Sequence, residues 1–160
     1  MRHLALYILF LLLTSCVSVN VNPSKVTRAK DVEFIAPSSP FHSIQNNSVD
    51  QAWQSKNTGN TIAYLSECGG SDISLKQMET ESLSAISQPN ILESKTGTYN
   101  DRESLESLAA GKVDGIEIKM KLILFKKNNC NYTISYIGRK DPFSAEENYF
   151  QKFISGFKAP

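Results

Sequence analysis

The chain has 160 residues, of which 41% are hydrophobic and 21% are charged, and this composition is that of a globular protein. Its 17 lysine and arginine residues nearly balance its 16 aspartate and glutamate residues. A chain so balanced lacks the charge excess that captures nucleic acid or anionic surfaces, so no nucleic-acid partner is expected. The length suits one domain with one hydrophobic core.

The N-terminal segment predicts an export signal. Arg2 and His3 form a short positive region, and the apolar run over residues 4–13 is too short for a transmembrane helix, which needs roughly 20 apolar residues. The end of this run resembles the bacterial lipobox, in which a peptidase cuts before a cysteine that carries diacylglycerol. The matching residues are Leu13, Thr14, Ser15 and Cys16. An ordinary secretory signal with a coincidental cysteine is the alternative.

This signal divides the chain into three parts. Residues 1–15 are expected to be a cleaved signal peptide, residues 16–30 a lipidated polar tether, and residues 31–160 one globular domain. Two or three acyl chains on Cys16 would hold the protein firmly on a membrane, whereas a single chain binds only marginally. Val17 follows the cysteine in place of Asp, which favours the outer membrane, facing the periplasm, if the host is Gram-negative.

Cys68 and Cys130 are the two cysteines that remain once Cys16 carries lipid. Export places them in an oxidising compartment, where a disulfide can form and persist. Both fall at the ends of predicted strands, on the same face as the apolar residues, so we expect them to form a disulfide. Two buried thiols on neighbouring strands are the alternative. Their wide spacing argues against a compact zinc ribbon and against a reactive redox pair.

Turn residues and hydrophobic alternation predict the elements of the first half. Short strands are expected over residues 32–35 and 41–48, and a hairpin over residues 50–68 has its turn at residues 57–60. The second strand of this hairpin alternates regularly, which places every other residue on one face. These residues are Ile62, Tyr64, Ser66 and Cys68.

A helix is predicted after the hairpin. Ser74 and Gln77 have the spacing of a capping box, and the apolar periodicity extends to about Ser87. Pro89 prevents the helix from continuing. Residues 91–99 then predict a strand because their alternation is mixed and a glycine lies among them.

The second half is dominated by a long hairpin. Residues 101–110 fit either a helix or a strand, and we favour a strand from Arg102 onward. Gly111 and Gly115 are expected to bracket a tight reversal. The clearest strand of the chain covers residues 116–125, and a turn returns the chain as a strand over residues 130–137.

The chain is predicted to end in a helix with a wide aromatic stripe. Ser144 and Glu147 repeat the capping-box spacing. The stripe consists of Tyr149, Phe150, Phe153, Ile154 and Phe157. Together these elements predict an α+β fold, in which helices cover the apolar face of an antiparallel sheet of about six strands and the other face is wetter.

The order of elements resembles the PsbP-like lipoproteins, exported bacterial relatives, in overall shape, of the photosystem oxygen-evolving subunit P. The resemblance covers about residues 31–158. It rests on Trp53, Thr61, Ile62, Cys68, Gly69, Arg102, Cys130, Tyr132, Phe150, Phe153 and Phe157. It implies an antiparallel sheet flanked by helices, a role in binding or assembly, and no set of catalytic residues.

The remaining candidate residues favour structural roles. His42 is the one histidine left after signal removal. A lone histidine in a loop after a proline is more often a solvated or packed residue than a catalytic base or a metal ligand. Glu146 and Glu147 lie in the first turn of the last predicted helix, where carboxylates interact favourably with the helix dipole. No sequence motif for a nucleophile elbow, a phosphate loop or a metal site is found, so no cofactor or metal is expected.

A possible interaction face remains on the long hairpin. Its basic strip could meet an acidic partner, although a solvated face that keeps the sheet soluble is the simpler interpretation. The strip consists of Lys119, Lys121, Lys126 and Lys127. The sequence thus predicts a lipid-anchored envelope protein, not an enzyme, that binds another envelope protein or supports an assembly. The alternative function is a carrier or sensor of a small apolar ligand held between the sheet and a helix.

Overall fold

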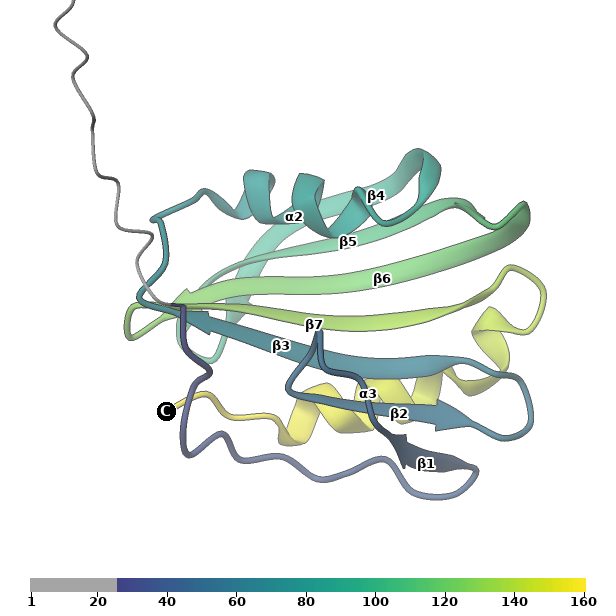
Figure 1. The fold of residues 1–160 in the computed structure, drawn as a ribbon, viewed down its shortest axis with the longest axis horizontal. Helices are drawn as coiled ribbons and strands as arrows, with labels where there is room; N and C mark the ends of the chain where they lie inside the picture. Colours follow the sequence, from purple (N-terminus) through teal and green to yellow (C-terminus); the bar gives the residue numbers. More distant parts are fainter. Residues whose placement is uncertain (1–25) are drawn as a thin grey trace, which may run out of the picture.

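A computed structural model describes residues 26–160, and in these residues the chain forms one seven-stranded antiparallel sheet with two α-helices (Figure 1). The elements are β1 (Phe41–Ile44), β2 (Gln51–Ser55), β3 (Thr61–Cys68), α2 (Leu75–Leu83), β4 (Ser87–Tyr99), β5 (Arg102–Val113), β6 (Ile116–Lys127), β7 (Cys130–Arg139), the 3₁₀ helix η1 (Phe143–Glu146) and α3 (Glu147–Gly156). The strand order is β1-β2-β3-β7-β6-β5-β4, so α2 carries the chain from β3 across the sheet to the far edge. The predicted α+β class is confirmed, with seven strands in place of about six.

Helices cover both faces of the sheet, so the prediction of one wetter face is wrong. In Figure 1, α2 lies on one side of β5 and β6, and α3 lies on the opposite side of the sheet. The centre of β6 shows why. Leu122 and Leu124 pack in the cluster with α2, whereas Ile123 and Phe125 pack in the cluster with α3. Four consecutive apolar residues mark a strand that is buried on both faces, where strict alternation no longer holds.

The core on the α3 side is mainly aromatic, as the predicted stripe requires. Phe150 stacks on Tyr136 with ring centroids 5.5 Å apart, and Phe153 lies 5.3 Å from Trp53. Full burial of such a side chain contributes on the order of 1.5 to 3 kcal/mol. Because α3 supplies several of these rings, it is an integral part of the core.

The start of α3 differs from the predicted capping box. Ser144 lies within η1, and no side chain caps the first turn of α3. Glu146 is buried, and its carboxylate accepts hydrogen bonds from Ser55 (2.8 Å) and Thr58 (2.5 Å). Glu146 therefore joins η1 to the β2–β3 hairpin, which the local sequence pattern could not indicate.

Three further boundaries differ from the predictions. Residues 32–35 are not a strand, because their sheet-like pairing is one isolated bridge between Glu33 and Lys158. Helix α2 ends at Leu83, and Pro89 lies in the edge strand β4, where a missing N–H is tolerated. The reversal after β5 is made at residues 114–115, where both residues have positive φ, and Gly111 lies inside β5.

The predicted strands over residues 91–99, 116–125 and 130–137 all form, and the ambiguous residues 101–110 belong to β5. The hairpin over residues 50–68 is also confirmed, with Gly59 at φ 77° in its turn. Strand β1 covers only the first part of the predicted strand over residues 41–48. Within residues 26–160 no helix is long and apolar enough to cross a membrane.

Candidate binding groove at the disulfide end of the sheet

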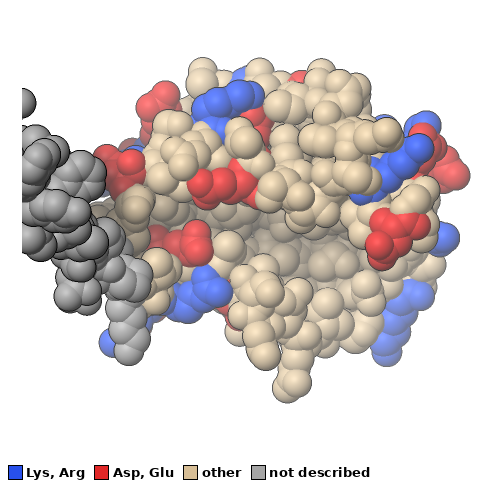
Figure 2. Space-filling model, turned by 45° about the horizontal axis from the view of Figure 1, so that its top comes forward, with Lys and Arg blue, Asp and Glu red and all other residues tan. Residues whose placement is uncertain are grey.

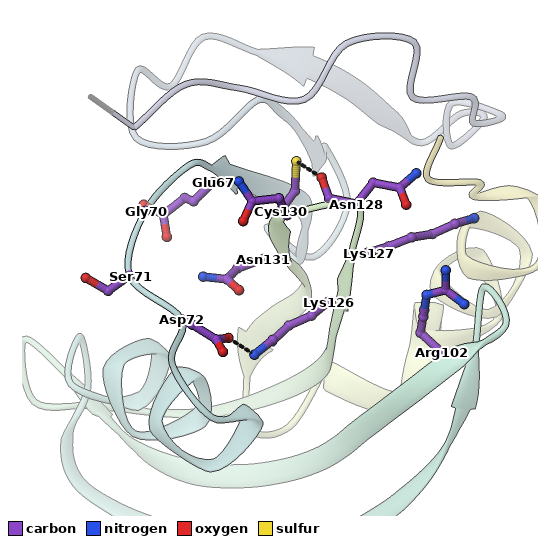
Figure 3. A pocket seen from close by; sticks show the side chains of 11 residues that line it. Glu67, Gly70, Ser71, Asp72, Arg102, Lys126, Lys127, Asn128, Cys130 and Asn131 are labelled. Atoms are coloured by element: carbon purple, nitrogen blue, oxygen red, sulfur yellow. Dashed lines mark hydrogen bonds and ion pairs between the residues drawn. The ribbon is translucent and has the colours of Figure 1, made fainter. Parts of the chain in front are cut away.

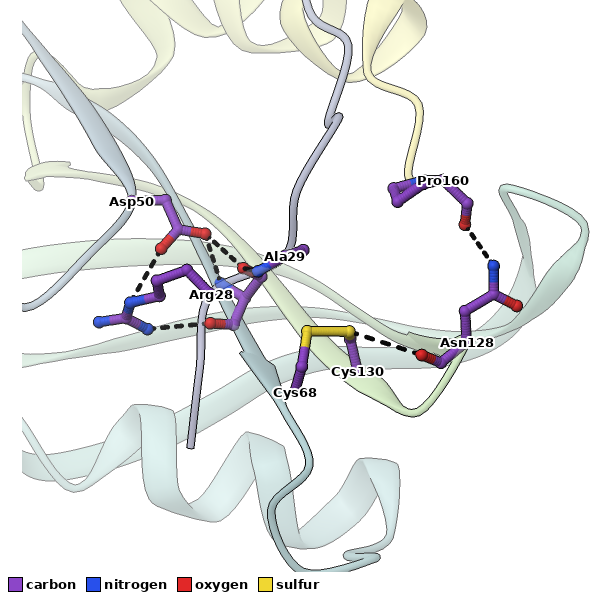
Figure 4. Close-up of a disulfide and its surroundings, with 8 residues drawn as sticks. Arg28, Ala29, Asp50, Cys68, Asn128, Cys130 and Pro160 are labelled. Carbon is purple, nitrogen blue, oxygen red and sulfur yellow. Dashed lines mark hydrogen bonds and ion pairs between the residues drawn. A yellow bond between two sulfur atoms is a disulfide. The ribbon is translucent and has the colours of Figure 1, made fainter. Parts of the chain in front are cut away.

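The disulfide lies where β3 ends and β7 begins. Cys68 and Cys130 face each other across the two strands and are joined, as predicted (Figure 4). Thr27 exchanges two backbone hydrogen bonds with Cys68, of 3.1 and 2.9 Å. The chain therefore enters the folded domain directly beside the disulfide.

Residues 26–30 form a segment that we call the N-terminal strap, which lies against β3. The guanidinium of Arg28 donates to the carbonyl oxygen of Ser66 at 2.9 Å and pairs with Asp50 at 3.0 Å (Figure 4). The amide of Ala29 donates to the hydroxyl of Ser66 at 2.8 Å. The part of the predicted tether that the structure describes is thus fixed to the domain. Cys16 and the rest of the lipobox, Leu13, Thr14 and Ser15, lie outside the described residues.

Asp50 is the centre of the contacts beneath the strap. Its side chain is only 9% exposed, and it accepts hydrogen bonds from both the backbone amide (2.9 Å) and the hydroxyl (2.5 Å) of Ser66. Burial and the charge of Asp50 raise the pKa of Tyr64 to about 12. Ser66 on β3 donates to only one oxygen of the Asp50 carboxylate, and Arg28 of the strap pairs with the other.

A polar hollow of about 230 Å³ lies beside the disulfide, between the segment after β3 and the β6–β7 turn (Figure 3). Its lining residues are Glu67, Gly70, Ser71, Asp72, Arg102, Lys126, Lys127, Asn128, Asn129, Cys130 and Asn131. Lys126 crosses this hollow, pairs with Asp72 and donates to the carbonyl oxygen of Ile73 at 3.0 Å. The hollow thus combines cations, carboxylates and amides.

A larger groove of about 640 Å³, which we call the α2 groove, adjoins the polar hollow. The first turn of α2 forms one side, and strands β4, β5 and β6 form the other. Its lining residues are Ser74, Leu75, Lys76, Thr96, Arg102, Glu103, Leu105 and Lys126. Arg102 and Lys126 line both the groove and the polar hollow, so the two spaces are neighbours. No sequence pattern indicates this groove, because its residues meet only through the path of α2 across the sheet.

The four lysines of the predicted interaction face do not form one strip. Lys119 lies over the Phe143 ring (6.0 Å), and Lys121 pairs with Glu147, so both point to the α3 side. Lys126 points to the segment before α2, and Lys127 donates to the carbonyl oxygen of Ala159 at 2.9 Å. On the face shown in Figure 2, lysine and arginine are interspersed with aspartate and glutamate, and no single-sign patch is formed.

The other candidate residues do not come together in one site. His42 is exposed on β1. Glu146 binds the β2–β3 turn and Glu147 pairs with Lys121, so the two carboxylates do not converge on a common site. Across residues 26–160, no group of three histidine, cysteine, aspartate or glutamate side chains is arranged to hold a metal ion.

Glu79, like Asp50, is a buried carboxylate that no sequence pattern indicates. Glu79 on α2 is fully buried against the sheet, where it accepts hydrogen bonds from Ser107 on β5 and Ser94 on β4 and pairs with Lys76. Burial alone would raise the pKa of this carboxyl, but the hydrogen bonds from Lys76, Ser107 and Ser94 and the charge of Lys76 outweigh burial and lower it. Glu79 therefore fixes α2, and with it one wall of the groove.

Comparison with known proteins identifies the fold. The structure is similar to cyanobacterial PsbP (CyanoP) from Synechocystis sp. PCC 6803, with a TM-score of 0.59 and 12% identity over 92% of this chain and 99% of that chain. It is also similar to LpqN of Mycobacterium tuberculosis, described as involved in cell envelope biogenesis, with a TM-score of 0.61 and 9% identity over 88% of each chain. A protein from Bacteroides thetaiotaomicron VPI-5482 matches with a TM-score of 0.53 and 12% identity, over 84% of this chain and 49% of that chain. The predicted PsbP-like fold is thus confirmed.

Sequence comparison adds nothing to this result. No protein-family model matches the sequence, and no curated protein is significantly similar to it. The structural neighbours are only 9 to 12% identical in sequence to this chain, so the similarity identifies the fold and does not identify the function.

Proposed function

We propose that this protein is a non-enzymatic lipoprotein of a bacterial cell envelope, anchored by lipid on Cys16, that binds another envelope protein or supports an assembly. The description of LpqN as involved in cell envelope biogenesis supports an envelope role. If the host is Gram-negative, Val17 favours the periplasmic side of the outer membrane.

One observation carries the proposal, namely the exposed aliphatic residues far from the strap. We call these residues the distal patch. They are Ile91 (40% exposed), Leu92 (45%), Val113 (41%) and Ile116 (53%). They lie on the halves of β4, β5 and β6 farthest from the disulfide, and β6 alone spans on the order of 40 Å at roughly 3.3 Å per residue (Figure 1). A domain anchored at its strap would therefore present the distal patch away from the membrane, where a partner can reach it.

Affinity capture tests the partner. The lipidated protein, purified from detergent-solubilised envelope, is expected to retain a stoichiometric partner, and Ile116→Asp is expected to lose it. Ile35→Ser is the matched control, because Ile35 is 72% exposed and lies outside the patch. Absence of any stoichiometric partner, or retention of the partner by Ile116→Asp, contradicts the docking role.

Fractionation tests the anchor separately. Cys16→Ser is expected to release the protein from the membrane fraction, because the acyl chains have no other attachment site in the lipobox. Membrane retention at the wild-type level would refute the lipid anchor.

The α2 groove favours a second candidate function, a carrier or sensor of a small apolar ligand. Its volume of about 640 Å³ lies within the range of small-molecule pockets, and Leu75 and Leu105 give it an apolar lining. Binding of the neutral probe N-phenyl-1-naphthylamine to the chain with Cys16→Ser, which carries no lipid, tests it. An increase in probe fluorescence that Leu75→Asp abolishes supports the carrier, and unchanged fluorescence contradicts it.

A further inference from the structure

The floor of the α2 groove suits an aliphatic chain. Leu75 comes from the first turn of α2, and Thr96 and Leu105 are paired neighbours on β4 and β5. Leu105 is only 6% exposed and belongs to the core cluster beneath α2. The groove therefore opens over apolar side chains that continue into the packed interior.

The rim of the groove is mainly cationic. Lys76, Arg102 and Lys126 face one carboxylate, Glu103. Lys76 is held by Glu79, and Lys126 is held by Asp72. The two ammonium groups are thus fixed at the rim by residues of the domain itself.

Arg102 differs from the two lysines because its charge is uncommitted. Its guanidinium donates one hydrogen bond, of 3.1 Å, to the carbonyl oxygen of the preceding Asp101. In residues 26–160 it forms no ion pair. A guanidinium has five N–H donors in a planar fork that matches a phosphate or carboxylate, so most of its capacity is open to a ligand.

The polar hollow provides space for the head of such a ligand. Arg102 and Lys126 stand at the junction of the two spaces, and the polar side adds Asn128, Asn129 and Asn131. In Figure 3, Arg102 on β5 lies beside Lys127, and the side chain of Lys126 on β6 points away from Arg102 toward Asp72. Two carboxylates line the hollow. Asp72 is paired with Lys126, and Glu67 lies on β3, which β7 and β6 separate from Arg102 on β5.

We propose that the α2 groove binds an anionic amphiphile, with its aliphatic chain over Leu75, Thr96 and Leu105 and its phosphate or carboxylate group at Arg102 and Lys126. The proposal rests on the carrier function and is independent of partner binding at the distal patch. A membrane lipid and a free amphiphile can both supply an aliphatic chain with an anionic head group, so the experiments must distinguish these two sources.

Calorimetric titration of the full chain with Cys16→Ser provides the test. Three probes are compared, each below its critical micelle concentration where it has one: dodecyl phosphate, dodecyl maltoside and inorganic phosphate. Dodecyl phosphate is expected to bind at least tenfold more tightly than either of the others. Arg102→Gln is expected to weaken dodecyl phosphate at least tenfold and to leave dodecyl maltoside unchanged. The matched control is Lys152→Gln, an exposed cation on α3, which should change neither affinity.

Each other outcome overturns part of the proposal. If inorganic phosphate binds as tightly as dodecyl phosphate, the site binds anions without using the aliphatic chain. If dodecyl maltoside binds as tightly as dodecyl phosphate, the groove binds amphiphiles without selecting for an anionic head group. Loss of binding to both dodecyl compounds would overturn the carrier as well. An unchanged affinity of Arg102→Gln for dodecyl phosphate would remove Arg102 from the site.

Vesicles distinguish the source of the ligand. Binding to phosphatidylglycerol vesicles that Arg102→Gln abolishes supports a membrane lipid, and binding of dodecyl phosphate without vesicle binding supports a free amphiphile. Vesicle binding that is insensitive to Arg102→Gln, with no affinity for dodecyl phosphate, would overturn the groove in favour of a surface contact.

Discussion

The side-chain amide of Asn60 lies directly over the backbone of Gly138. A Cβ at residue 138 would overlap the Oδ1 atom of Asn60 and stand 2.7 Å from its Cγ. The amide nitrogen of Asn60 donates to the Tyr136 hydroxyl at 2.8 Å and to the Pro142 carbonyl oxygen at 3.0 Å. Asn60 thereby joins the β2–β3 turn to the end of β7, and Gly138 is required because only hydrogen fits there.

Gly138→Ala is therefore expected to destabilise the fold by roughly 1 to 3 kcal/mol, since a methyl group forced into a filled site displaces its neighbours. Urea denaturation followed by the fluorescence of Trp53 measures the change. Gly70→Ala is the matched control, because a Cβ at residue 70 meets its nearest neighbour at an ordinary 3.5 Å. Combining Gly138→Ala with Asn60→Ala should cost less than the sum of the two changes, because the second removes the clash. Strict additivity would show that the two residues do not interact.

The disulfide is expected to be a major source of stability. Cys68 and Cys130 are 62 residues apart, and closing a loop of that length stabilises by about 4 kcal/mol by the loop-entropy relation. The double variant Cys68→Ser and Cys130→Ser should therefore unfold at markedly lower urea concentration than the oxidised protein. Mass spectrometry without reductant should find the two cysteines linked in native protein. Free thiols at both positions, or equal urea midpoints, would contradict this account.

Much of the sheet could be predicted from the sequence because its strands alternate. The strand over residues 130–137 has one buried face, and its first residue is the cysteine that pairs with Cys68. The alternation of β6 predicts that strand equally well, but it predicts a solvated second face, which is wrong. Ile123 and Phe125 share that face with Lys119 and Lys121, and only the position of α3 shows that it is covered.

The candidate groove could not be predicted by comparable reasoning. Leu75, Thr96, Arg102 and Lys126 come from four different elements, and no spacing along the chain connects them. They meet because α2 crosses the sheet and because β4, β5 and β6 pair in a particular register. Residues 32–35 resemble a strand in sequence because Val32 and Phe34 alternate with exposed residues and pack on the core, although the segment makes only one isolated bridge.

The strap is expected to depend on Asp50. Removing this carboxylate leaves the Arg28 guanidinium without its partner and leaves the amide of Ser66 without an acceptor. Asp50→Ala should therefore free the strap, and limited trypsin digestion should cleave after Arg28 at least several times faster than in the wild type. Glu33→Ala is the control, since its pair with Lys158 is exposed, 3.9 Å long and of little energetic value. Equal cleavage rates in Asp50→Ala and the wild type would show that other contacts hold the strap.

The stability of the fold at acidic pH is expected to depend on the charge of the Glu79 carboxylate. Its pKa in the folded protein lies below the ordinary value of 4.5, so the folded state favours the charged carboxylate. The resulting stabilisation is complete above that ordinary value and is lost as the pH falls through the lower pKa of the folded state. Glu79→Gln should reduce stability at pH 7 by roughly 1.5 to 3 kcal/mol, the range for a hydrogen bond to a charged group.

The two proteins should become more alike as the medium is acidified. Urea midpoints measured from pH 7 down to pH 3 are expected to fall less steeply for Glu79→Gln than for the wild type, because the variant has no proton to take up at this position. Glu117→Gln is the matched control, since Glu117 is 59% exposed in its pair with Lys140. Its curve should follow that of the wild type. Parallel curves for Glu79→Gln and the wild type would mean that the carboxylate beneath α2 is not what makes the fold acid-sensitive.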